Sequence, residues 1–280
     1  MKRIVTIQDI SCFGKCSLTV ALPIISAIGV EAAVVPTAVL STHTGGFTGF
    51  TFRDLSGDIP GIFSHWEKEN LHFDAIYTGY LGSFEQIDMM REYILKRDDN
   101  TLAFVDPAMG DNGVLYTGFT PDFAKHMASL CSVADVIVPN LTEASFMLGI
   151  DYVESGYDKD YIEDILKKLA NLGAKKVVLT GVSFAENELG VAMYDSETGK
   201  IFYYFNEKVE AKFHGTGDVF ASTCVGALMN GMSLADALKV AVDFVLECIR
   251  VTLPEREKCW YSVQFEKAIP YLINKMTNRM

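Results

Sequence analysis

The chain has 280 residues, of which 49% are hydrophobic and 11% aromatic. This length and composition can bury a sizeable core, which excludes a mostly disordered protein and fits one large α/β domain or two smaller ones. The formal net charge of -12 argues against a nucleic-acid partner, because neutralising phosphates takes clustered Lys and Arg. Any phosphate site must therefore act locally, through backbone N–H groups, helix N-termini and a metal.

Short β-rich runs alternate with helical periodicity along the chain, the pattern of βαβ units and a largely parallel sheet. Apolar runs predict strands at residues 3–7, 32–39, 75–78, 102–105, 136–138 and 177–179, and a hairpin from 191–194 and 201–205. Helices are predicted between them, with signals at Gly29 as a stop, Ser83-x-x-Gln86 as a capping box, Thr120-Pro121 as a start and Gly173 as a stop. After Asp218 the chain is expected to be helical to its end.

The chain shows no sign of division or of export. No linker, repeat or low-complexity stretch interrupts it, so a single domain over residues 1–280 is expected. The basic start at Met1–Gln8 lacks the apolar stretch of a secretory signal, and no later apolar run reaches membrane-spanning length. The six scattered cysteines indicate free or buried thiols in a reducing compartment. We expect a cytoplasmic protein with no membrane partner.

Polar and glycine-rich residues follow the predicted strands, where open parallel sheets bind their ligands. They are Gln8-Asp9, residues 41–46, Thr78-Gly79-Tyr80, Asp106, Asn140 with Glu143, and Thr180-Gly181. Turns are polar in any protein, so a single one of these segments indicates little. Their shared location at strand ends predicts a ligand site.

The segment Gly215-Thr216-Gly217-Asp218 precedes a run with helical spacing of apolar residues. Small residues let a ligand approach the backbone, and the N–H groups at a helix start point outward, which suits a transferring phosphoryl group. A carboxylate in the same turn can accept the proton of a substrate hydroxyl. Taken alone, these four residues also fit an ordinary glycine-rich helix start with an acidic first turn.

Together with the other strand-end motifs, this segment resembles the ribokinase-like superfamily, and specifically its pyridoxal (pyridoxamine) kinases. The corroborating motifs are Ile7-Gln8, His43-Thr44-Gly45, Thr78-Gly79-Tyr80-Leu81-Gly82-Ser83, Asp106-Pro107-Ala108-Met109-Gly110-Asp111 and Pro139-Asn140-Leu141-Thr142-Glu143. The resemblance covers nearly the whole chain. It implies an α/β ribokinase-like fold, a central mostly parallel sheet flanked by helices on both faces, commonly dimeric, with ATP and substrate meeting at the strand ends.

The resemblance also implies roles for the glycine-rich turn. Asp218 corresponds to the base that deprotonates the substrate's hydroxymethyl group. Gly215, Thr216 and Gly217 correspond to residues whose backbone N–H groups hold the γ-phosphate during transfer.

A second group of residues matches the family's nucleotide side. Asp106 and Glu143 resemble the carboxylates nearest Mg²⁺, which prefers hard oxygen ligands and keeps several waters. The alternatives are a turn carboxylate for Asp106 and a solvated first-turn residue for Glu143. Four further positions match nucleotide-binding residues: Asp111, Asn140, Thr180 and Tyr116.

Two details of this side follow from the resemblance. Thr180 matches a position where some relatives use a hydroxyl and others a nearby lysine, but Gly181 follows here, so the lysine is absent. Tyr116 lies in the segment 110–118, which we expect to cover ATP like a lid. The family often needs a monovalent cation such as K⁺, and we expect the same here.

On the substrate side, Thr44 and Tyr80 match residues that hold the pyridine ring, and an aromatic face suits an aromatic ring. The alternative for Tyr80 is a core tyrosine after a strand. His43 is expected to orient the substrate, or else to be a turn histidine bonded to backbone. Asp9 departs from the family, which usually has a small hydroxyl residue after the Ile-Gln pair; a carboxylate there can pair with the aminomethyl group of pyridoxamine or with an aminopyrimidine.

These assignments predict an ATP-dependent homodimeric kinase that transfers the γ-phosphate to the 5′-hydroxymethyl group of a B6 vitamer. The alternative enzyme is hydroxymethylpyrimidine (phosphomethylpyrimidine) kinase, which the same base and phosphate-binding turn would serve. A vitamin-binding or carrier protein is a third reading. Asp218 argues against that reading, because binding alone needs no carboxylate beside a phosphate site.

Overall fold

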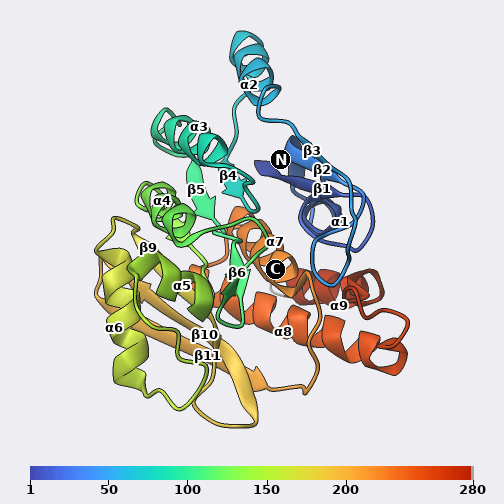
Figure 1. The fold of residues 1–280 in the computed structure, drawn as a ribbon, viewed down its shortest axis with the longest axis vertical. Coiled ribbons are helices and arrows are strands. Elements are labelled where there is room, and N and C mark those ends of the chain that lie inside the picture. The colour runs from blue at the N-terminus through green and yellow to red at the C-terminus, as the bar shows by residue number, and fades with distance from the viewer. Residues whose placement is uncertain (279–280) are drawn as a thin grey trace. The chain divides into compact units, whose positions relative to one another are not determined.

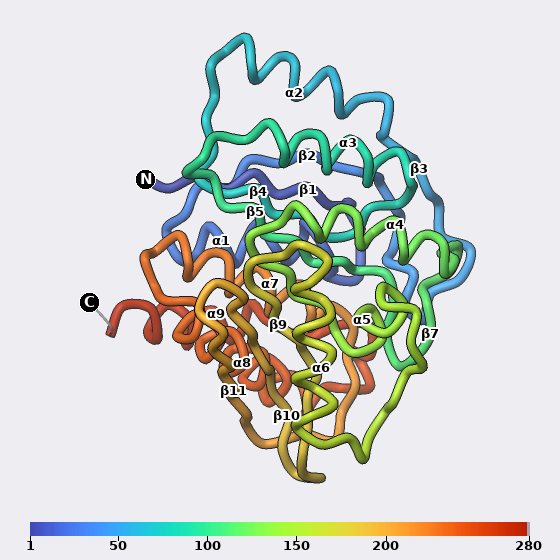
Figure 2. Tube along the Cα trace, turned by 90° about the vertical axis from the view of Figure 1, so that its left-hand side faces the viewer, coloured from blue at the N-terminus to red at the C-terminus, as the bar shows by residue number. Residues whose placement is uncertain are grey.

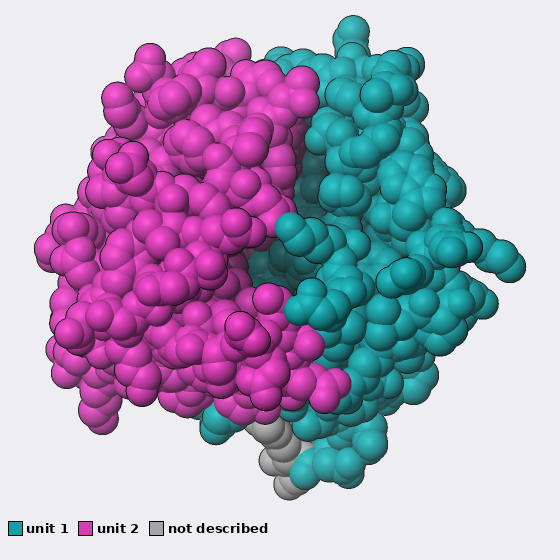
Figure 3. Space-filling model, turned by 60° about the horizontal axis from the view of Figure 1, so that its bottom comes forward, with its two compact units in different colours: residues 1–75, 209–280 teal, residues 76–208 magenta. Residues whose placement is uncertain are grey.

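Strands and helices alternate along residues 1–278, the part of the chain that the computed structural model describes (Figure 1). These residues form two compact units, coloured separately in Figure 3. Unit 1 combines residues 1–75 with the C-terminal segment from residue 209, and unit 2 is formed by residues 76–208. The expectation of a single domain stays a prediction.

Unit 1 contains one end of the sheet and five α-helices. Its elements are β1 (Arg3–Ser11), α1 (Leu18–Ala27), β2 (Glu31–Leu40), β3 (Phe52–Asp54), α2 (Ile59–Lys68), α7 (Thr216–Met229), α8 (Leu234–Thr252), the 3₁₀ turn η1 (Leu253–Glu255) and α9 (Phe265–Thr277). Strand β2 pairs parallel with β1 and antiparallel with β3. In Figures 1 and 2, α1 and α2 lie on opposite sides of β2.

Helix α7 is enclosed within unit 1. Every residue from Val219 to Ala227 is buried, so the helix has no solvent-facing stripe over this stretch. It packs against α1 and α8, and α8 packs in turn against α9. The apolar cluster between these helices is formed by Val20, Ile24, Ile28, Val219, Val240, Phe244, Cys248, Val263, Phe265, Ala268 and Leu272. This packing gives the turn before α7 a rigid support.

Helices α1 and α7 run in the same direction. At their C-terminal ends, Asn230 Nδ2 donates to the Ile28 carbonyl at 3.1 Å. Gly226 lies so close to Ile28 that an added Cβ would come within 2.3 Å of the Ile28 side chain. At their N-terminal ends, Gly215 packs in the same way against the carbonyl of Lys15. The chain therefore brings both helix starts to the same place in unit 1.

Unit 2 carries the other strands and four helices. Its elements are β4 (Ala75–Thr78, which begins at the unit boundary), α3 (Phe84–Leu95), β5 (Leu102–Val105), β6 (Gly110–Asp111), β7 (Val114–Leu115), α4 (Pro121–Cys131), β8 (Val136–Ile137), α5 (Leu141–Leu148), α6 (Lys159–Ala170), β9 (Lys176–Val182), β10 (Glu188–Asp195) and β11 (Lys200–Glu207). Strands β5, β8 and β9 pair in parallel, and β9, β10 and β11 pair antiparallel. Helix α6 packs on β9 and β10 (Figure 2).

The strand pairings confirm the predicted α/β class with a mostly parallel sheet. Nine strands follow the order β11-β10-β9-β8-β5-β4-β1-β2-β3, and β6 with β7 forms a separate two-stranded sheet. Every predicted strand is present, and the hairpin of β10 and β11 is confirmed. Within residues 1–278, no helix is both long and apolar enough to cross a membrane.

The boundaries of several elements differ from the predicted ones. Gln8 and Asp9 lie inside β1, and Thr180 lies inside β9, where strands were expected to have ended. In β1 the pairing with β2 shifts register between Gln8 and Ile10, so the strand continues past its polar residues by way of a bulge. Helix α6 ends at Ala170, before the predicted stop at Gly173.

The Ser83 start of α3 is confirmed, with one difference. Ser83 Oγ accepts the Gln86 N–H at 3.2 Å, and Gln86 Oε1 accepts the N–H of Gly82 at 2.7 Å. The return bond of the predicted capping box therefore reaches one residue before the N-cap.

Candidate active site

The predicted phosphate-binding turn forms the start of α7 in unit 1. Gly215 is the N-cap, with φ 79°, a backbone conformation that favours glycine. A Cβ at Gly215 would lie 2.4 Å from the Lys15 carbonyl, whereas a Cβ at Gly217 would meet no atom of the described residues within 4 Å. The turn therefore packs tightly on one side and is open at Gly217. N–H groups of the first turn of a helix lack partners within the helix and can bind an anion.

Asp218 lies in the first turn of α7 and is half-buried. Burial raises the pKa of its carboxyl from 3.8 to about 7, the Ser17 N–H opposes this rise by hydrogen bonding, and the nearby Asp9 carboxylate adds to it. A carboxylate with a pKa near 7 is a stronger base than an ordinary aspartate, and it is about half ionised at pH 7 and largely ionised above it. Asp218 is therefore suited to accept a proton from a hydroxyl.

Asp9 belongs to the same charged group. Its side chain is 4% exposed, and its Oδ2 accepts a hydrogen bond from Ser11 Oγ at 2.9 Å. Burial raises the pKa of Asp9, and hydrogen bonds from Ser17 and Ser11 oppose the rise. Burial together with the charges of Asp218 and Asp9 raises the pKa of the Cys16 thiol well above its ordinary value. Two carboxylates and a thiol therefore share one buried region, and the thiol stays neutral.

His43 is fixed by backbone on both sides of its ring. Nε2 lies 2.8 Å from the Tyr261 carbonyl, and Nδ1 accepts the Gly45 N–H at 3.1 Å, so the proton is on Nε2. Burial lowers the pKa of His43, the bond to Tyr261 opposes this, and repulsion from His214 lowers it further. This geometry matches the alternative of a turn histidine bonded to backbone; the role of His43 in orienting substrate stays a prediction. Thr44 follows in the same turn and is half-buried.

An aromatic cluster surrounds this turn in unit 1. The Phe47 ring centroid lies 5.0 Å from that of His43 and 4.8 Å from that of Trp260, and the Phe13 centroid lies 4.8 Å from that of Tyr261. Phe13 and Trp260 are 50% and 46% exposed. The chain thus leaves two large aromatic faces open next to the turn that carries Thr44.

Glu143 occupies the centre of the predicted nucleotide side in unit 2. It is 3% exposed, Oε1 accepts the Met109 N–H at 3.0 Å, and Oε2 accepts the Asn140 N–H at 2.9 Å. Asn140 Oδ1 accepts the Glu143 N–H in return, which completes a capping box at the start of α5. Burial raises the pKa of Glu143 to about 8, against the hydrogen bonds from Asn140, Met109 and Gly110. The alternative of a solvated first-turn residue is wrong.

Asp106 and Thr180 lie just after or within two strands of unit 2, β5 and β9, that both pair with β8. Asp106 directly follows β5, is 8% exposed, and its N–H donates to the Thr78 carbonyl at 2.9 Å. Thr180 bridges to Asn140 in parallel pairing, and its N–H donates to the Pro139 carbonyl at 2.9 Å. The charges of Glu143 and Asp106 both raise the pKa of buried Cys131, after burial itself. Unit 2 therefore brings two of the predicted carboxylates close to one thiol.

The predicted lid segment is a small hairpin. Gly110 pairs with Leu115 and Asp111 with Val114, and the turn between them has positive φ at Asn112 and Gly113. The Gly113 N–H donates to Thr142 Oγ1 at 2.9 Å, which fastens the hairpin to α5. Asp111 is exposed, and Asn140 Nδ2 donates to the Gly110 carbonyl at 2.8 Å.

Both predicted aromatic residues of unit 2 are partly accessible. Tyr116 follows the hairpin, is 37% exposed, and its N–H donates to the Met109 carbonyl at 2.8 Å. Tyr80 is half-buried, with its ring centroid 5.4 Å from that of Phe119. Its reading as a substrate contact stays a prediction.

The described residues offer no ready-made cage for a metal ion. Within residues 1–278, no group of three or more His, Cys, Asp or Glu side chains could hold one. Mg²⁺ keeps most of its waters and needs few protein carboxylates. The assignment of Asp106 and Glu143 to Mg²⁺ stays a prediction.

Comparison with known proteins places the chain in a family. The family model described as phosphomethylpyrimidine kinase matches residues 21–260. The chain belongs to the phosphomethylpyrimidine kinase family. It is therefore a phosphotransferase, as its motifs predicted.

Individual members of this family agree with the predicted resemblance to pyridoxal kinases. Pyridoxine kinase of Bacillus subtilis is 30% identical over 192 residues, covering 66% of this chain and 67% of that protein. A crystal structure of a putative phosphomethylpyrimidine kinase from Bacteroides thetaiotaomicron, determined with pyridoxal, is 38% identical, with a TM-score of 0.91 over 97% of this chain and 95% of that one. Pyridoxal kinase from Lactobacillus plantarum is 32% identical, with a TM-score of 0.89 over 98% and 97% of the two chains.

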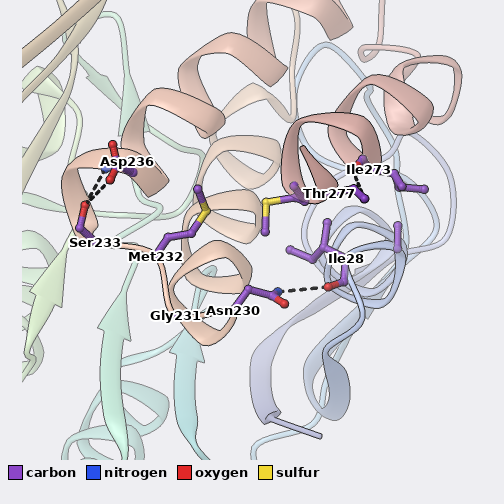
Figure 4. Close-up of a pocket in the computed structure, with 10 residues that line it drawn as sticks. Ile28, Asn230, Gly231, Met232, Ser233, Asp236, Ile273 and Thr277 are labelled. Atoms are coloured by element: carbon purple, nitrogen blue, oxygen red, sulfur yellow. Dashed lines mark hydrogen bonds between the residues drawn. The ribbon is translucent and has the colours of Figure 1, made fainter. Parts of the chain in front are cut away.

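A cavity of unit 1 lies at the opposite end of α7 from Asp218. It has about 500 Å³ and is lined by the C-terminal ends of α1, α7 and α9 and the start of α8 (Figure 4). In Figure 4, Asn230 bonds to Ile28 and Ser233 to Asp236, so these polar groups serve one another. With 14 residues in α7 and a rise of ~1.5 Å per residue, this end of the helix is ~20 Å from Asp218.

Several residues beside the predicted site were not identified from the sequence. They are the aromatic cluster of Phe13, Phe47, Trp260 and Tyr261, and the loop residues Lys15 and Cys16, which lie against Gly215. The aromatic residues come from three distant segments, so no local pattern connects them. The Asn140-x-x-Glu143 capping box had a recognisable pattern.

Proposed function

We propose that this chain transfers the γ-phosphate of ATP to the 5′-hydroxymethyl group of a B6 vitamer. The observation that carries the proposal is Asp218, a first-turn carboxylate with its pKa raised to about 7 beside the glycine turn of α7. The relatives of 30% identity or more that act on or contain pyridoxine or pyridoxal support this substrate class.

In this mechanism Asp218 takes the proton of the vitamer's hydroxyl while the hydroxyl oxygen attacks the γ-phosphorus. The bond from the γ-phosphorus to the β–γ bridging oxygen breaks, and ADP leaves. The backbone N–H groups of Gly215, Thr216 and Gly217 stabilise the charge on the transferred phosphoryl group. The aromatic ring of the vitamer is held by Thr44 and Tyr80, and by His43 through the turn that it orders. A base whose pKa lies near the working pH is ionised in a large fraction of the molecules and still binds a proton strongly enough to remove it from the hydroxyl.

Asp106 and Glu143 are the residues that would hold Mg²⁺, with Asp111, Asn140, Thr180 and Tyr116 on the nucleotide. Both Glu143 oxygens already accept backbone N–H groups, and these bonds hold its carboxylate in place. The metal, when bound, neutralises charge on the ATP phosphates. A requirement for K⁺, a homodimeric state and a cytoplasmic location belong to the same proposal.

Phosphorylation of hydroxymethylpyrimidine is the second candidate function. Asp9 favours it, because a buried carboxylate can bind an amino group on a pyrimidine ring as well as the aminomethyl group of pyridoxamine. The description of the family agrees with this reading. Both candidates use the same base and differ only in the ring.

The deciding experiment measures ATP consumption with pyridoxal, pyridoxine, pyridoxamine and hydroxymethylpyrimidine in parallel, for wild type and for Asp218→Asn. The proposal expects at least one B6 vitamer to exceed hydroxymethylpyrimidine in kcat/KM, and Asp218→Asn to lose transfer while retaining ligand binding. Preference for hydroxymethylpyrimidine selects the second function. Normal turnover by Asp218→Asn refutes the assigned base in both.

The contribution of Asp9 is measured with Asp9→Ser. If its carboxylate binds the substrate's amine, the ratio of pyridoxamine to pyridoxal turnover falls in this variant, whereas Ser11→Ala, which removes a hydroxyl bonded to Asp9, leaves the ratio unchanged. An unchanged ratio in Asp9→Ser contradicts the amine contact.

A further inference from the structure

A row of aromatic rings in unit 2 begins at Tyr80, the residue predicted to contact the substrate ring. The ring centroids are 5.4 Å apart between Tyr80 and Phe119, 4.1 Å between Phe119 and Phe123, and 5.5 Å between Phe123 and Phe84. Phe123 is 2% exposed, whereas Phe84, at the start of α3, is 45% exposed. The row therefore runs from the predicted substrate contact through a buried ring to the surface.

The buried part of this row is held firmly. The planes of the Phe119 and Phe123 rings are only 5° apart, so the two rings stack. Phe123 lies in the first turn of α4, where its N–H donates to the N-cap Thr120 Oγ1 at 3.3 Å. Helices α3 and α4 pack side by side (Figure 1), and His126 Nε2 lies 2.7 Å from Asp88 Oδ1 across them. The Phe119 ring therefore rests on a rigid helix pair.

The backbone around Tyr80 is also fixed, which leaves the orientation of its ring to be determined. The Thr78 carbonyl accepts the Asp106 N–H at 2.9 Å, and the Gly82 N–H donates to a glutamine side chain of α3 at 2.7 Å. A tyrosine ring still turns about two side-chain bonds. The Phe119 ring lies against the ring of Tyr80 with its plane tilted by 32°, and this contact restricts those rotations.

The backbone of Phe119 is anchored on the predicted nucleotide side. Its N–H donates to the Tyr116 carbonyl at 3.0 Å, and the Tyr116 N–H donates to the Met109 carbonyl at 2.8 Å. The Met109 N–H in turn donates to Glu143 Oε1 at 3.0 Å. Phe119 thus lies between the capping box of Glu143 and the predicted substrate contact.

A role at the start of α4 accounts for only one of the two contacts of Phe119. The residue directly precedes the N-cap Thr120, and its stack on Phe123 resembles the hydrophobic staple that fixes the entry of a chain into a helix. A staple stabilises the helix start and needs no contact with Tyr80. The ring of Phe119 nevertheless contacts that residue as well.

We propose that Phe119 is a positioning residue for Tyr80: its ring, stacked on Phe123, holds the Tyr80 ring in the orientation that meets the aromatic ring of the substrate. The proposal rests on the proposed function, because it assigns a role through Tyr80. It adds to the site a residue that touches neither the phosphate nor the reacting hydroxyl.

The test is kinetic and compares wild type with Phe119→Ala and Phe119→Leu, using pyridoxine and ATP. In both variants the KM for pyridoxine is expected to rise about three- to ten-fold, the effect of losing one aromatic pair. The kcat at saturating pyridoxine and the KM for ATP should stay within about two-fold of wild type, because the base and the nucleotide contacts are unchanged. Phe119→Tyr keeps the ring and should keep the wild-type KM.

Phe119→Leu keeps the result decisive if Phe119→Ala does not fold. Leucine retains apolar packing on Phe123 but has no flat ring to place against Tyr80. Phe84→Ala is the matched control, because it removes another ring that packs on Phe123. It should lower the midpoint of thermal unfolding and leave the KM for pyridoxine unchanged.

A double-mutant cycle with Tyr80→Ala separates positioning from a purely structural role. Tyr80→Ala should itself raise the KM for pyridoxine. Adding Phe119→Leu to Tyr80→Ala should raise this KM no further, because the effect of Phe119 passes through the tyrosine ring. A structural role at the start of α4 would instead lower the stability of both backgrounds equally and would not depend on Tyr80.

Three results overturn the proposal. An unchanged KM for pyridoxine in Phe119→Ala and Phe119→Leu would confine Phe119 to the start of α4. Full additivity with Tyr80→Ala would show that Phe119 acts independently of Tyr80, and an unchanged KM in Tyr80→Ala would remove Tyr80 from the substrate site. None of these results bears on the proposed function, which fails separately if Asp218→Asn retains turnover or if wild type phosphorylates no B6 vitamer; in that last case the role of Phe119 is refuted with it.

Discussion

Replacement of Asp218 by asparagine is expected to remove activity and to stabilise the folded chain. The amide cannot accept the proton of the substrate hydroxyl, and general bases contribute ~10²- to ~10⁴-fold to rate. The same change removes a carboxyl that the fold disfavours in its ionised form, because burial raises its pKa from 3.8 to about 7. The site is thus maintained at a cost in stability.

The magnitude follows from this rise in pKa. Because the folded-state pKa lies above the unfolded one, folding favours the protonated carboxyl, and wild type loses stability as the pH rises from about 4 to about 7. At ~1.4 kcal/mol for each pH unit, the rise gives an upper bound of ~4 kcal/mol at pH 8. Asp218 is partly exposed, so solvent screening reduces the expected gain in the free energy of unfolding. For Asp218→Asn we expect a gain between ~2 and ~4 kcal/mol.

The assay is thermal unfolding of both proteins from pH 4 to pH 9, together with ATP turnover. The midpoint of Asp218→Asn should exceed that of wild type by several degrees at pH 8, and the difference should shrink steadily below pH 7 and approach zero near pH 4. Equal midpoints at every pH would show that the carboxyl is not disfavoured in the fold. A pH-independent difference would attribute the gain to packing rather than to charge.

Four further predictions concern the same turn and the nucleotide side. With pyridoxine as substrate, kcat/KM should rise through an acid limb near pH 7 and stay level above it, because Asp218 must be ionised to act; a limb near pH 4 in pH–rate measurements would contradict this. Gly215→Ala should lower both the unfolding midpoint and turnover, since its Cβ would lie 2.4 Å from a carbonyl oxygen at φ +79°. In Gly217→Ala the added Cβ meets no described atom within 4 Å, so the unfolding midpoint should stay unchanged. Turnover should fall at least ~10-fold, because the methyl group would occupy the path of the phosphoryl group. Unchanged turnover would show that this turn does not bind the phosphoryl group. Glu143→Gln should cost ~1 to ~3 kcal/mol in urea unfolding and raise the KM for Mg·ATP, because an NH₂ group replaces one acceptor of a buried N–H; unchanged stability would count against the capping box.

The helices and strands with a regular spacing of apolar residues could be predicted, because the buried face of each element produces that spacing in the sequence. Residues 75–78 and 102–105 were placed to the residue as strands, and Thr120 was identified as the N-cap of α4. Short elements escaped prediction, since β3, β6 and β7 have two or three residues each and carry no period. Polar residues inside β1 and β9 were assigned to turns because a polar residue ending an apolar run resembles a strand end.

The candidate site divides in the same way. Asp218 and the glycines before it form one continuous segment, so a motif identified them together. The burial of Glu143 was not foreseen, because the sequence does not show that both its oxygens bind backbone N–H groups. Ser262 donates to the carbonyl of Lys15, 247 residues away along the chain, and a single sequence has no signal for such a contact.

The parallel arrangement of α1 and α7 has an electrostatic consequence for a chain of net charge -12. Each α-helix carries a macrodipole equivalent to about half a positive charge at its N-terminus, and the starts of these two helices meet at Gly215 and Lys15. Their fields add near the carboxylates of Asp9 and Asp218. An acidic protein thereby gains a small region whose backbone N–H groups can attract a phosphate oxygen, while the ammonium group of Lys15 is paired with Glu266.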